Sequence, residues 1–239
     1  MPVRVSSSRY AWTVTSSPYS PTSEPDRGHP RGLFVAFEGG DGAGKSTQAR
    51  LLAGSLLAAG HEVLLTREPG GTPIGEKLRS LVLEHGQGEV DARTEALIFA
   101  AARAAHVAQT VKPALDRGSI VITDRYIGSS IVYQGIARGL GAEPVRDLNV
   151  WATEGLWPDL TVLLDVDETE GRARRAADDA VEDRLESESD DFHRNVRTAF
   201  LDLAEERPDA YLVLDGRRPL DELAERILAA VTRSLQARL

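Results

Sequence analysis

The sequence predicts an α/β fold in which a parallel sheet is covered by helices on both faces. Five short apolar runs, each long enough for one strand, alternate with helical stretches from residue 33 onward. Strands that alternate with helices in this way form parallel sheets. A glycine-rich phosphate-binding motif between the first strand and the first helix supports the same fold, because that motif needs a strand–loop–helix context.

The elements follow one another along the chain without an internal repeat. We expect the strands at 33–37, 62–66, 119–123, 160–166 and 211–214. We expect the helices at about 45–59, 74–84, 93–117, 143–156, 168–176, 188–206 and 219–237. Ligands bind beyond the carboxyl ends of the strands in such sheets, so the side chains that follow each strand are the candidate site.

Residues 1–31 differ from the rest of the chain. They are rich in Ser, Pro and Thr and lack apolar periodicity. We therefore expect a disordered N-terminal extension at 1–31 and one folded domain at 32–239, with a targeting peptide as the alternative for the extension.

Composition narrows the function classes. The chain has 239 residues, 41% of them hydrophobic, a formal charge of −9 and no cysteine. An acidic chain without a long basic run argues against nucleic acid as a partner, and the absence of cysteine excludes disulfides and Cys-based zinc sites. The five histidines are scattered, and we interpret them as surface or helix residues. No apolar run approaches the roughly 18 residues of a membrane span, so we expect no membrane partner. The absence of cysteine fits a reducing compartment, and we expect a cytoplasmic location.

The phosphate-binding motif spans residues 39–46 and is the most specific signal in the chain. It reads Gly39-Gly40-Asp41-Gly42-Ala43-Gly44-Lys45-Ser46, followed by Thr47. The glycines let backbone N–H groups converge on phosphate oxygens, and the following helix adds its positive end. Lys45 is expected to reach the β- and γ-phosphates of ATP, and Ser46 to hold Mg²⁺.

Two further motifs follow the second and third strands. Arg67 and Glu68 lie in the segment Thr66–Thr72, whose proline and paired glycines indicate a tight loop. Asp124 and Arg125 follow the third strand. Asp124 is placed to orient Mg²⁺, and Arg125 to bind a phosphate through two nitrogens, with a structural ion pair as the alternative.

The remaining candidates are weaker when taken singly. Phe99 and Arg103 share one helix face at i, i+4, which also fits a core phenylalanine beside a surface arginine. Tyr133 and Gln134 could read a sugar and a base. Residues 170–190 alternate basic and acidic runs, which fits either a solvated helix or a lid that carries arginines over bound phosphates.

Taken together, these motifs resemble those of bacterial thymidylate kinases. The matching pieces are residues 38–47, 66–72, Glu76–Arg79, Phe99–Arg103, Asp124–Tyr126, Tyr133–Gly135 and Asp183–Glu186. The resemblance covers about residue 32 to the C-terminus. It implies a P-loop NTPase fold of the nucleoside-monophosphate-kinase type, with a five-stranded parallel sheet, flanking helices and a lid at about 170–187.

The resemblance also implies an activity and a set of roles. The reaction would transfer the γ-phosphoryl group of ATP to dTMP, which gives dTDP for dTTP synthesis, and the usual assembly is a homodimer. The catalytic set would contain Lys45, Asp124, Arg125 and lid arginines. The set that binds dTMP would contain Asp41, Arg67, Glu68, Arg79, Phe99, Arg103, Arg125, Ser129, Ser130, Tyr133 and Gln134.

Within that set, Phe99 would stack on thymine, and Arg103 and Gln134 would face the base. Arg67, Arg79 and Arg125 would hold the 5′-phosphate. Tyr133 would crowd the sugar C2′, and Asp41 or Glu68 would meet the 3′-OH. The Glu68–Pro69 peptide is expected to be cis.

One departure concerns the catalytic arginine. Some family members carry it inside the phosphate-binding loop, but position 42 is glycine here, so the lid must supply it. The candidates are Arg172, Arg174, Arg175 and Arg184. We expect Arg172 and Arg175 to act in catalysis and Arg184 to bind ATP.

Two other functions remain open at this point. Another P-loop nucleotide kinase, or a deoxynucleoside kinase with Glu38 as the base, would share most motifs. A non-catalytic P-loop binding module would share the phosphate loop alone, and the sequence lacks the Asn-Lys-x-Asp motif by which switch proteins read guanine.

Overall fold

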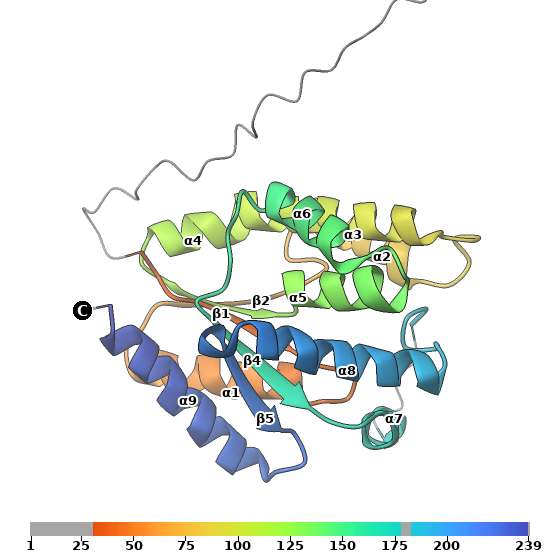
Figure 1. Ribbon diagram of the computed structural model, residues 1–239. Helices are drawn as coiled ribbons and strands as arrows, with labels where there is room; N and C mark the ends of the chain where they lie inside the picture. The colour runs from red at the N-terminus through yellow and green to blue at the C-terminus, as the bar shows by residue number, and fades with distance from the viewer. Residues whose placement is uncertain (1–30, 178–182, 239) are drawn as a thin grey trace, which may run out of the picture.

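A computed structural model of the protein describes residues 31–177 and 183–238. The expected N-terminal extension at 1–31, apart from Arg31, and residues 178–182 of the expected lid lie outside the described residues. Five parallel strands form one sheet in the order β2-β3-β1-β4-β5 (Figure 1). The strands are β1 (Phe34–Glu38), β2 (Val63–Arg67), β3 (Ile120–Asp124), β4 (Leu160–Asp165) and β5 (Tyr211–Asp215). Each predicted strand is present, with ends shifted by no more than one residue.

The helices lie between the strands, as the alternating pattern predicts. They are α1 (Lys45–Ala58), α2 (Pro73–Leu83), α3 (Ala92–His106), α4 (Lys112–Asp116), α5 (Ile127–Ser130), α6 (Ala142–Ala152), α7 (Glu168–Ala177), α8 (Asp190–Glu206) and α9 (Leu220–Gln236). Two π-helical segments, η1 (Val107–Val111) and η2 (Ile131–Ala137), and one 3₁₀ turn, η3 (Pro208–Ala210), complete the set.

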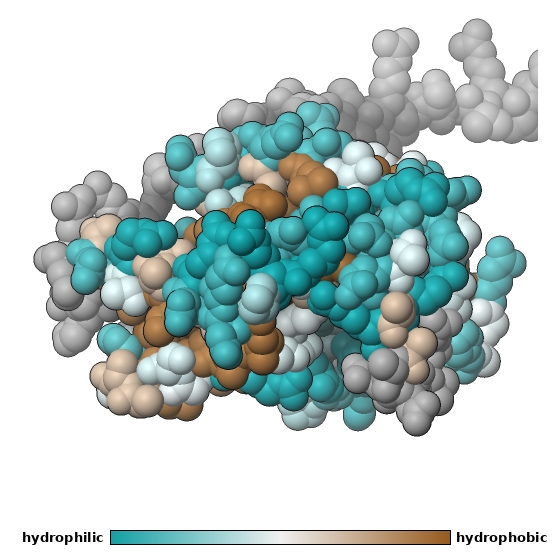
Figure 2. All heavy atoms as spheres, turned by 90° about the horizontal axis from the view of Figure 1, so that it is seen from below, coloured by the Kyte–Doolittle hydropathy of each residue, from teal (hydrophilic) through white to brown (hydrophobic). Residues whose placement is uncertain are grey.

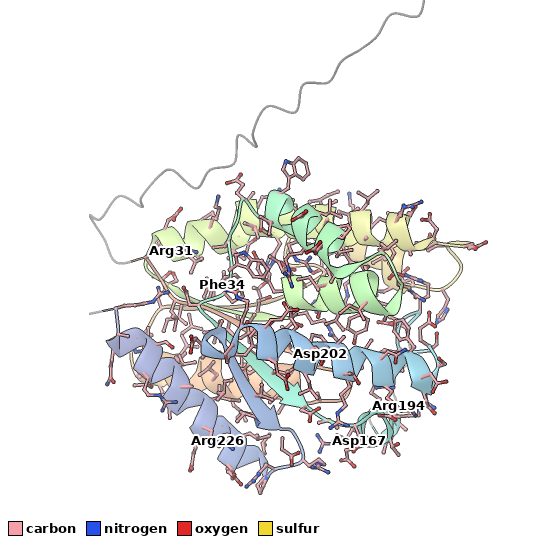
Figure 3. All side chains as sticks on the ribbon, viewed as in Figure 1. Arg31, Phe34, Asp167, Arg194, Asp202 and Arg226 are labelled. Carbon is pink, nitrogen blue, oxygen red and sulfur yellow. The ribbon has the colours of Figure 1, made fainter. Side chains whose placement is uncertain are left out.

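Two hydrophobic layers sandwich the sheet. Along β1, Phe34 and Ala36 face the layer beneath α3, η2 and α8, whereas Val35 and Phe37 face the layer beneath α1 and α9. This alternation follows from the two-residue period of a strand. Figure 1 shows α1 and α9 near each other at the lower left of the molecule, and Figure 3 labels Phe34 at the start of the central strand. A strand buried on both faces explains the uninterrupted apolar run that precedes the phosphate loop.

All strands end at the same edge of the sheet because they are parallel. Phe37 of β1 is in register with Asp124 of β3, so the end of β1 and the end of β3 lie side by side. The phosphate loop leaves β1 at this edge, between the neighbouring strands β3 and β4. The topology therefore brings the motifs that follow β1, β2 and β3 to one place.

One helical segment differs from our expectation. Residues 127–137 form a continuous helix, α5 followed by the wider turns of η2, where we expected no helix. The backbone N–H of Arg138 bonds the carbonyl of Tyr133, five residues earlier. Ile131 and Val132 are buried in the layer beneath α3 and α8, and this packing stabilises the segment. The expected helix 93–117 is likewise divided into α3, η1 and α4.

Seen from below, the surface of the molecule is mostly hydrophilic. Figure 2 shows hydrophobic residues gathered toward its lower left and a smaller group at its upper centre. Leu51 and Leu57 of α1 are among the exposed large hydrophobic residues. In the part of the chain that the structure describes, no helix is both long and apolar enough to cross a bilayer.

Substitution of Leu163 tests the central packing. Leu163 lies in β4 and is 1% exposed, whereas Leu57 on α1 is 56% exposed. We expect Leu163→Ala to lower the free energy of unfolding by about 2–5 kcal/mol, because it leaves a cavity in the core. Leu57→Ala is the matched control and should change it by less than about 0.5 kcal/mol. Urea unfolding of both variants measures the difference, and equal losses would contradict this account of the core.

Candidate functional site

The phosphate loop has the geometry of an anion cradle. Gly44, with a φ of 91°, ends the loop, and no side chain caps the first turn of α1. The N–H groups of that turn are therefore open to a ligand, and the positive end of the helix dipole points the same way. Lys45 is buried and donates from Nζ to the carbonyl of Gly40 at 2.7 Å, which holds the ammonium over the loop.

Ser46 and Asp124 meet across the sheet edge, where the Ser46 hydroxyl donates to Asp124 Oδ2. Hydroxyl and carboxylate oxygens are the ligands that Mg²⁺ prefers, and magnesium sites commonly take further ligands from water and substrate phosphates. Among the described residues, no three or more carboxylates and imidazoles converge as a metal cage. The pair therefore fits a Mg²⁺ ion bound together with a nucleotide.

Arg125 lies at the centre of the strand ends. Its guanidinium forms an ion pair with Asp41 of the phosphate loop and donates to the Gly39 carbonyl at 3.2 Å and to Ser129 Oγ at 3.0 Å. Its backbone φ is 69°, a strained value for a residue with a side chain, and such strain often marks functional positions. Arg125 thus ties the phosphate loop to the start of α5.

The site concentrates positive charge. Burial, followed by the charge of Arg125, lowers the pKa of Lys45, and burial, followed by the charge of Arg67, lowers the pKa of Arg79. Burial alone would raise the pKa of Asp41, but Arg125, Lys45 and Arg175 outweigh it and hold that pKa well below its usual range. Neighbouring positive charges thus lower the pKa values of Lys45 and Arg79, and such a concentration of cations attracts a phosphate anion.

A buried polar network underlies the loop that follows β2. Glu68 accepts from Arg103 Nε at 2.5 Å through one oxygen and contacts His106 Nδ1 at 2.8 Å through the other. His106 Nε2 lies 2.8 Å from the Thr66 hydroxyl. Arg103 also donates to Ser130 at 2.9 Å and to Asn149. The network fixes both Glu68 and Arg103, whose charges compensate one another in the interior.

A cavity of about 770 Å³ joins these groups. Phe99, Gln134 and Tyr133 form one part of its wall, and Lys45, Ser46 and Thr47 form another. The volume lies in the range of small-molecule sites, roughly 300–1,000 Å³. The cavity can therefore hold two groups at once, one on the phosphate loop and one beside the aromatic wall.

Helix α7, which begins the segment expected to form a lid, packs directly on the phosphate loop. A side chain at Gly171 would place its Cβ 2.5 Å from the Asp41 carbonyl, and one at Gly42 would clash with the backbone of Gly171. These glycines permit an approach that lets Arg175 Nη1 donate to the Asp41 carbonyl at 2.9 Å. Asp167, labelled in Figure 3, starts the helix by accepting the N–H of Glu170 at 2.9 Å.

Comparison with known proteins agrees with this geometry. The thymidylate kinase family model matches residues 37–227. The thymidylate kinase of Leifsonia xyli subsp. xyli is 53% identical over 207 residues, which cover 87% of this chain and 95% of that protein. The chain belongs to the thymidylate kinase family. The thymidylate kinase of Deinococcus radiodurans is 48% identical over 202 residues, 84% of this chain and 97% of that protein.

A solved family structure shares the fold. The crystal structure of thymidylate kinase from Ehrlichia chaffeensis superposes with a TM-score of 0.68 at 32% identity, and the match covers 85% of this chain and 99% of that one. The expected fold class, a five-stranded parallel sheet flanked by helices in a P-loop kinase, is confirmed.

The structure brings most of the predicted site residues together. Those that line the cavity are Asp41, Gly42, Gly44, Lys45, Ser46, Thr47, Arg67, Glu68, Arg79, Phe99, Arg103, Asp124, Arg125, Ser129, Ser130, Tyr133, Gln134 and Arg175. Gly39, Gly40 and Ala43 belong to the loop backbone beneath them. The Glu68–Pro69 peptide is cis, as the resemblance implies.

Two predicted arginine side chains do not line the cavity. Arg172 points to α8 and pairs with Asp190 at 2.5 Å, because it lies on the helix face away from the phosphate loop. Arg184 pairs with the buried Glu95 and donates to the Val82 carbonyl at 2.9 Å, so its guanidinium is engaged outside the expected ATP site. Neither expected role has support from this geometry.

Sequence reasoning assigned no role to Arg50, Arg174, Asp183 and Glu186, which also line the cavity, although Arg174 was among the candidates for the catalytic arginine. His106 is fully buried, although we interpreted the histidines only as surface or helix residues, and it supports Glu68 from below. Its spacing from Phe99, seven residues or two helical turns, is the signal that could have placed it on the buried face of α3.

The ion pair of Asp41 predicts a pH dependence of stability. Because its folded-state pKa is held below the unfolded value of about 4, the charge of Asp41 stabilises the fold fully above about pH 5 and progressively less as the pH falls. The difference in Tm between wild type and Asp41→Asn should be constant above about pH 5 and shrink toward pH 3. Asp116→Asn, at an exposed position, is the control. A difference that grows on acidification would contradict the prediction.

The lid arginines form a matched pair for kinetics. Arg175 contacts the phosphate loop and lines the cavity, whereas Arg172 pairs with Asp190 on α8. We expect Arg175→Ala to lower kcat by about 10³-fold or more, as for arginines that stabilise a transferring phosphoryl group. Arg172→Ala should stay within about threefold of wild type. Steady-state kinetics of both variants measure the two effects. A larger loss of kcat in Arg172→Ala than in Arg175→Ala would show that Arg172 is the catalytic arginine.

Proposed function

We propose that the chain transfers the γ-phosphoryl group of ATP to dTMP and releases ADP and dTDP. The observation that carries this proposal is the single cavity in which a phosphate loop faces a second group of arginines beside an aromatic wall. Membership of the thymidylate kinase family supports it.

ATP would bind with its phosphates on the loop and the first turn of α1. Lys45 would contact the β- and γ-phosphates, and the loop N–H groups would bind their oxygens. Ser46 and Asp124 would hold Mg²⁺, which would neutralise part of the charge of the phosphates. Arg175 would stabilise the charge that develops on the transferring group, since it reaches the same loop from the lid.

The 5′-phosphate of dTMP would bind among three cationic side chains. Arg67, Arg79 and Arg125 all line the cavity. Arg67 pairs with Glu76 at 3.0 Å and Arg79 donates to the Pro69 carbonyl at 3.0 Å, which positions both guanidinium groups beside the loop that follows β2. These partners leave further N–H donors on each guanidinium for a phosphate.

Thymine would bind against Phe99, with Arg103 and Gln134 at its edge. Four of the five N–H groups of Arg103 are used by Glu68, Ser130, Asn149 and the Tyr126 carbonyl, so one Nη2 hydrogen is left for a carbonyl oxygen. Thymine O4 is such an acceptor, whereas cytosine carries an amine there. Tyr133 and Asp41 would lie beside the sugar, where their hydrogen bond at 3.1 Å fixes both.

The reaction needs no protein base. The attacking oxygen belongs to a phosphate whose second pKa is about 6, so it is largely ionised at neutral pH. The barrier comes from bringing two anionic groups into line. Lys45, Arg125 and Arg175 offset that repulsion from fixed positions, which costs no reorganisation at the moment of transfer.

The rival functions fit the geometry less well. A deoxynucleoside kinase would need a carboxylate base near the 5′-OH, and Glu38 was the candidate. Glu38 is buried, accepts hydrogen bonds from Tyr126 and Ser129, and does not line the cavity. A binding module without catalysis would not need the second group of arginines.

We also propose a homodimer and a cytoplasmic enzyme. Leu97 of α3 is 58% exposed and Trp151 of α6 is 65% exposed, on two helices that pack against each other. Large apolar side chains in this position suit a self-complementary interface. A chain without cysteine is suited to a reducing compartment.

Sedimentation tests the dimer. We expect wild type to sediment as a dimer at micromolar concentration and Trp151→Ser to shift it toward monomer, because the variant removes apolar area from the interface. Val213→Ser, at an exposed position on the edge strand β5, is the control. A wild-type monomer would overturn the proposal.

A substrate panel tests the reaction. ADP release with Mg·ATP should be fastest with dTMP, modestly slower with dUMP and much slower with dCMP, dGMP, AMP and thymidine. The thymine methyl group contributes only about 1 kcal/mol. Turnover of thymidine but not dTMP would support the nucleoside kinase, and no turnover would support the binding module.

Lys45 is the sharpest single test of the phosphate loop. We expect Lys45→Ala to abolish turnover while the far-UV circular dichroism and Tm stay near wild type, because the residue acts on the phosphates. Lys112→Ala, which removes a surface pair with Glu154, is the control and should keep full activity. Near-normal kcat in Lys45→Ala would exclude the proposed role.

A further inference from the structure

A buried carboxylate, Glu95, lies behind the wall that faces the base. It occupies the first turn of α3 and is fully buried. Gln134 Nε2 donates to its Oε1 at 2.9 Å, and Arg138 approaches both oxygens at 3.4 Å. Arg184 forms an ion pair with Oε2. Two guanidinium groups thus compensate the charge, which satisfies the usual condition for burying a carboxylate.

Glu95 determines which way the Gln134 amide points. A carboxylate with two cationic partners offers only acceptor oxygens, so the amide NH₂ group of Gln134 must face it. The opposite end of the amide, Oε1, is then left for the cavity that Gln134 lines. Within the described residues, no donor bonds this oxygen. The cavity wall therefore presents an acceptor at Gln134 and the remaining donor of Arg103.

This pattern distinguishes two pyrimidines. Thymine has a donor at N3 and an acceptor at O4, whereas cytosine has an acceptor at N3 and a donor at the neighbouring amine. We infer that Glu95 is a specificity-determining positioning residue: by fixing the Gln134 amide with its oxygen toward the base, it selects thymine over cytosine. The inference rests on the proposed reaction with dTMP.

Arg184 extends this arrangement to the lid segment. Its backbone N–H bonds the Leu83 carbonyl at 3.0 Å and its Nε bonds the Val82 carbonyl at 2.9 Å, at the end of α2. Arg138, the second partner of Glu95, pairs with Glu188 at 2.6 Å. Arg184 and Arg138 thus hold Glu95 through two ion pairs. Glu95 cannot turn away from Gln134 without breaking both of them. This explains why a residue outside the cavity can fix a group within it.

The test is Glu95→Gln, a nearly isosteric change. An amide at position 95 can donate to the Gln134 oxygen, which lets the Gln134 amine turn toward the base and bond cytosine N3. We expect kcat/KM for dCMP relative to dTMP to rise by about tenfold, the effect of exchanging one mismatched hydrogen bond. The dUMP to dTMP ratio should stay unchanged, because uracil and thymine share N3 and O4.

A second variant removes the residue through which Glu95 acts. In a Gln134→Leu background, Glu95→Gln should no longer alter the dCMP to dTMP ratio, because the coupling between two positions vanishes when one partner is absent. Arg138→Gln weakens the same cluster but leaves Glu95 and Gln134 in place, so it should keep the ratio within about twofold. A purely structural role would lower kcat/KM for all three substrates equally.

Several results would overturn the inference. An unchanged dCMP to dTMP ratio in a folded Glu95→Gln variant would do so. A rise of about tenfold in this ratio that persists when Glu95→Gln is made in the Gln134→Leu background would also do so. If Glu95→Gln does not fold, Glu95→Asp keeps the charge but withdraws it from Gln134, and the ratio should rise there as well. Failure of the unaltered chain to phosphorylate dTMP would instead reject the proposed reaction, and the inference with it.

Discussion

The site depends on one half-buried guanidinium, that of Arg125. A charged group that is largely removed from solvent is stable only when its donors are bonded, and Arg125 bonds the phosphate loop through Asp41 and Gly39 and the start of α5 through Ser129. These partners come from segments far apart in the sequence. The requirement to compensate this single charge therefore holds the strand ends, the loop and the helix behind it in one arrangement.

The close approach of α7 to the phosphate loop is a second constraint. Gly42 and Gly171 leave no room for side chains between the two segments. An arginine within the loop at position 42 would collide with the lid backbone, whereas a lid that packs this tightly brings Arg175 to the loop instead. Gly42 therefore permits the close packing of α7 on the loop, and this packing brings Arg175 to the loop.

Much of the fold and part of the site followed from local patterns. The five strands, the phosphate loop and the Ser46–Asp124 pair were predictable because apolar runs and motif spacing act over a few residues, and parallel strands end at one edge. The helix at 127–137 was not predicted. Its apolar residues are held by packing against α3 and α8, and its wide π-helical turns leave a weaker periodic signal than an α-helix.

By itself, the sequence determined the order of strands and helices along the chain, the phosphate-binding motif and the family to which the chain belongs. Only the tertiary structure decided which lid arginine faces the loop: Arg172, Arg174 and Arg175 lie within four residues of one another, and helix rotation alone separates a cavity position from a surface pair. It also decided the partners of Glu95 and His106. Buried polar networks join residues from distant segments, so their pairing depends on how the elements pack and leaves no local signature.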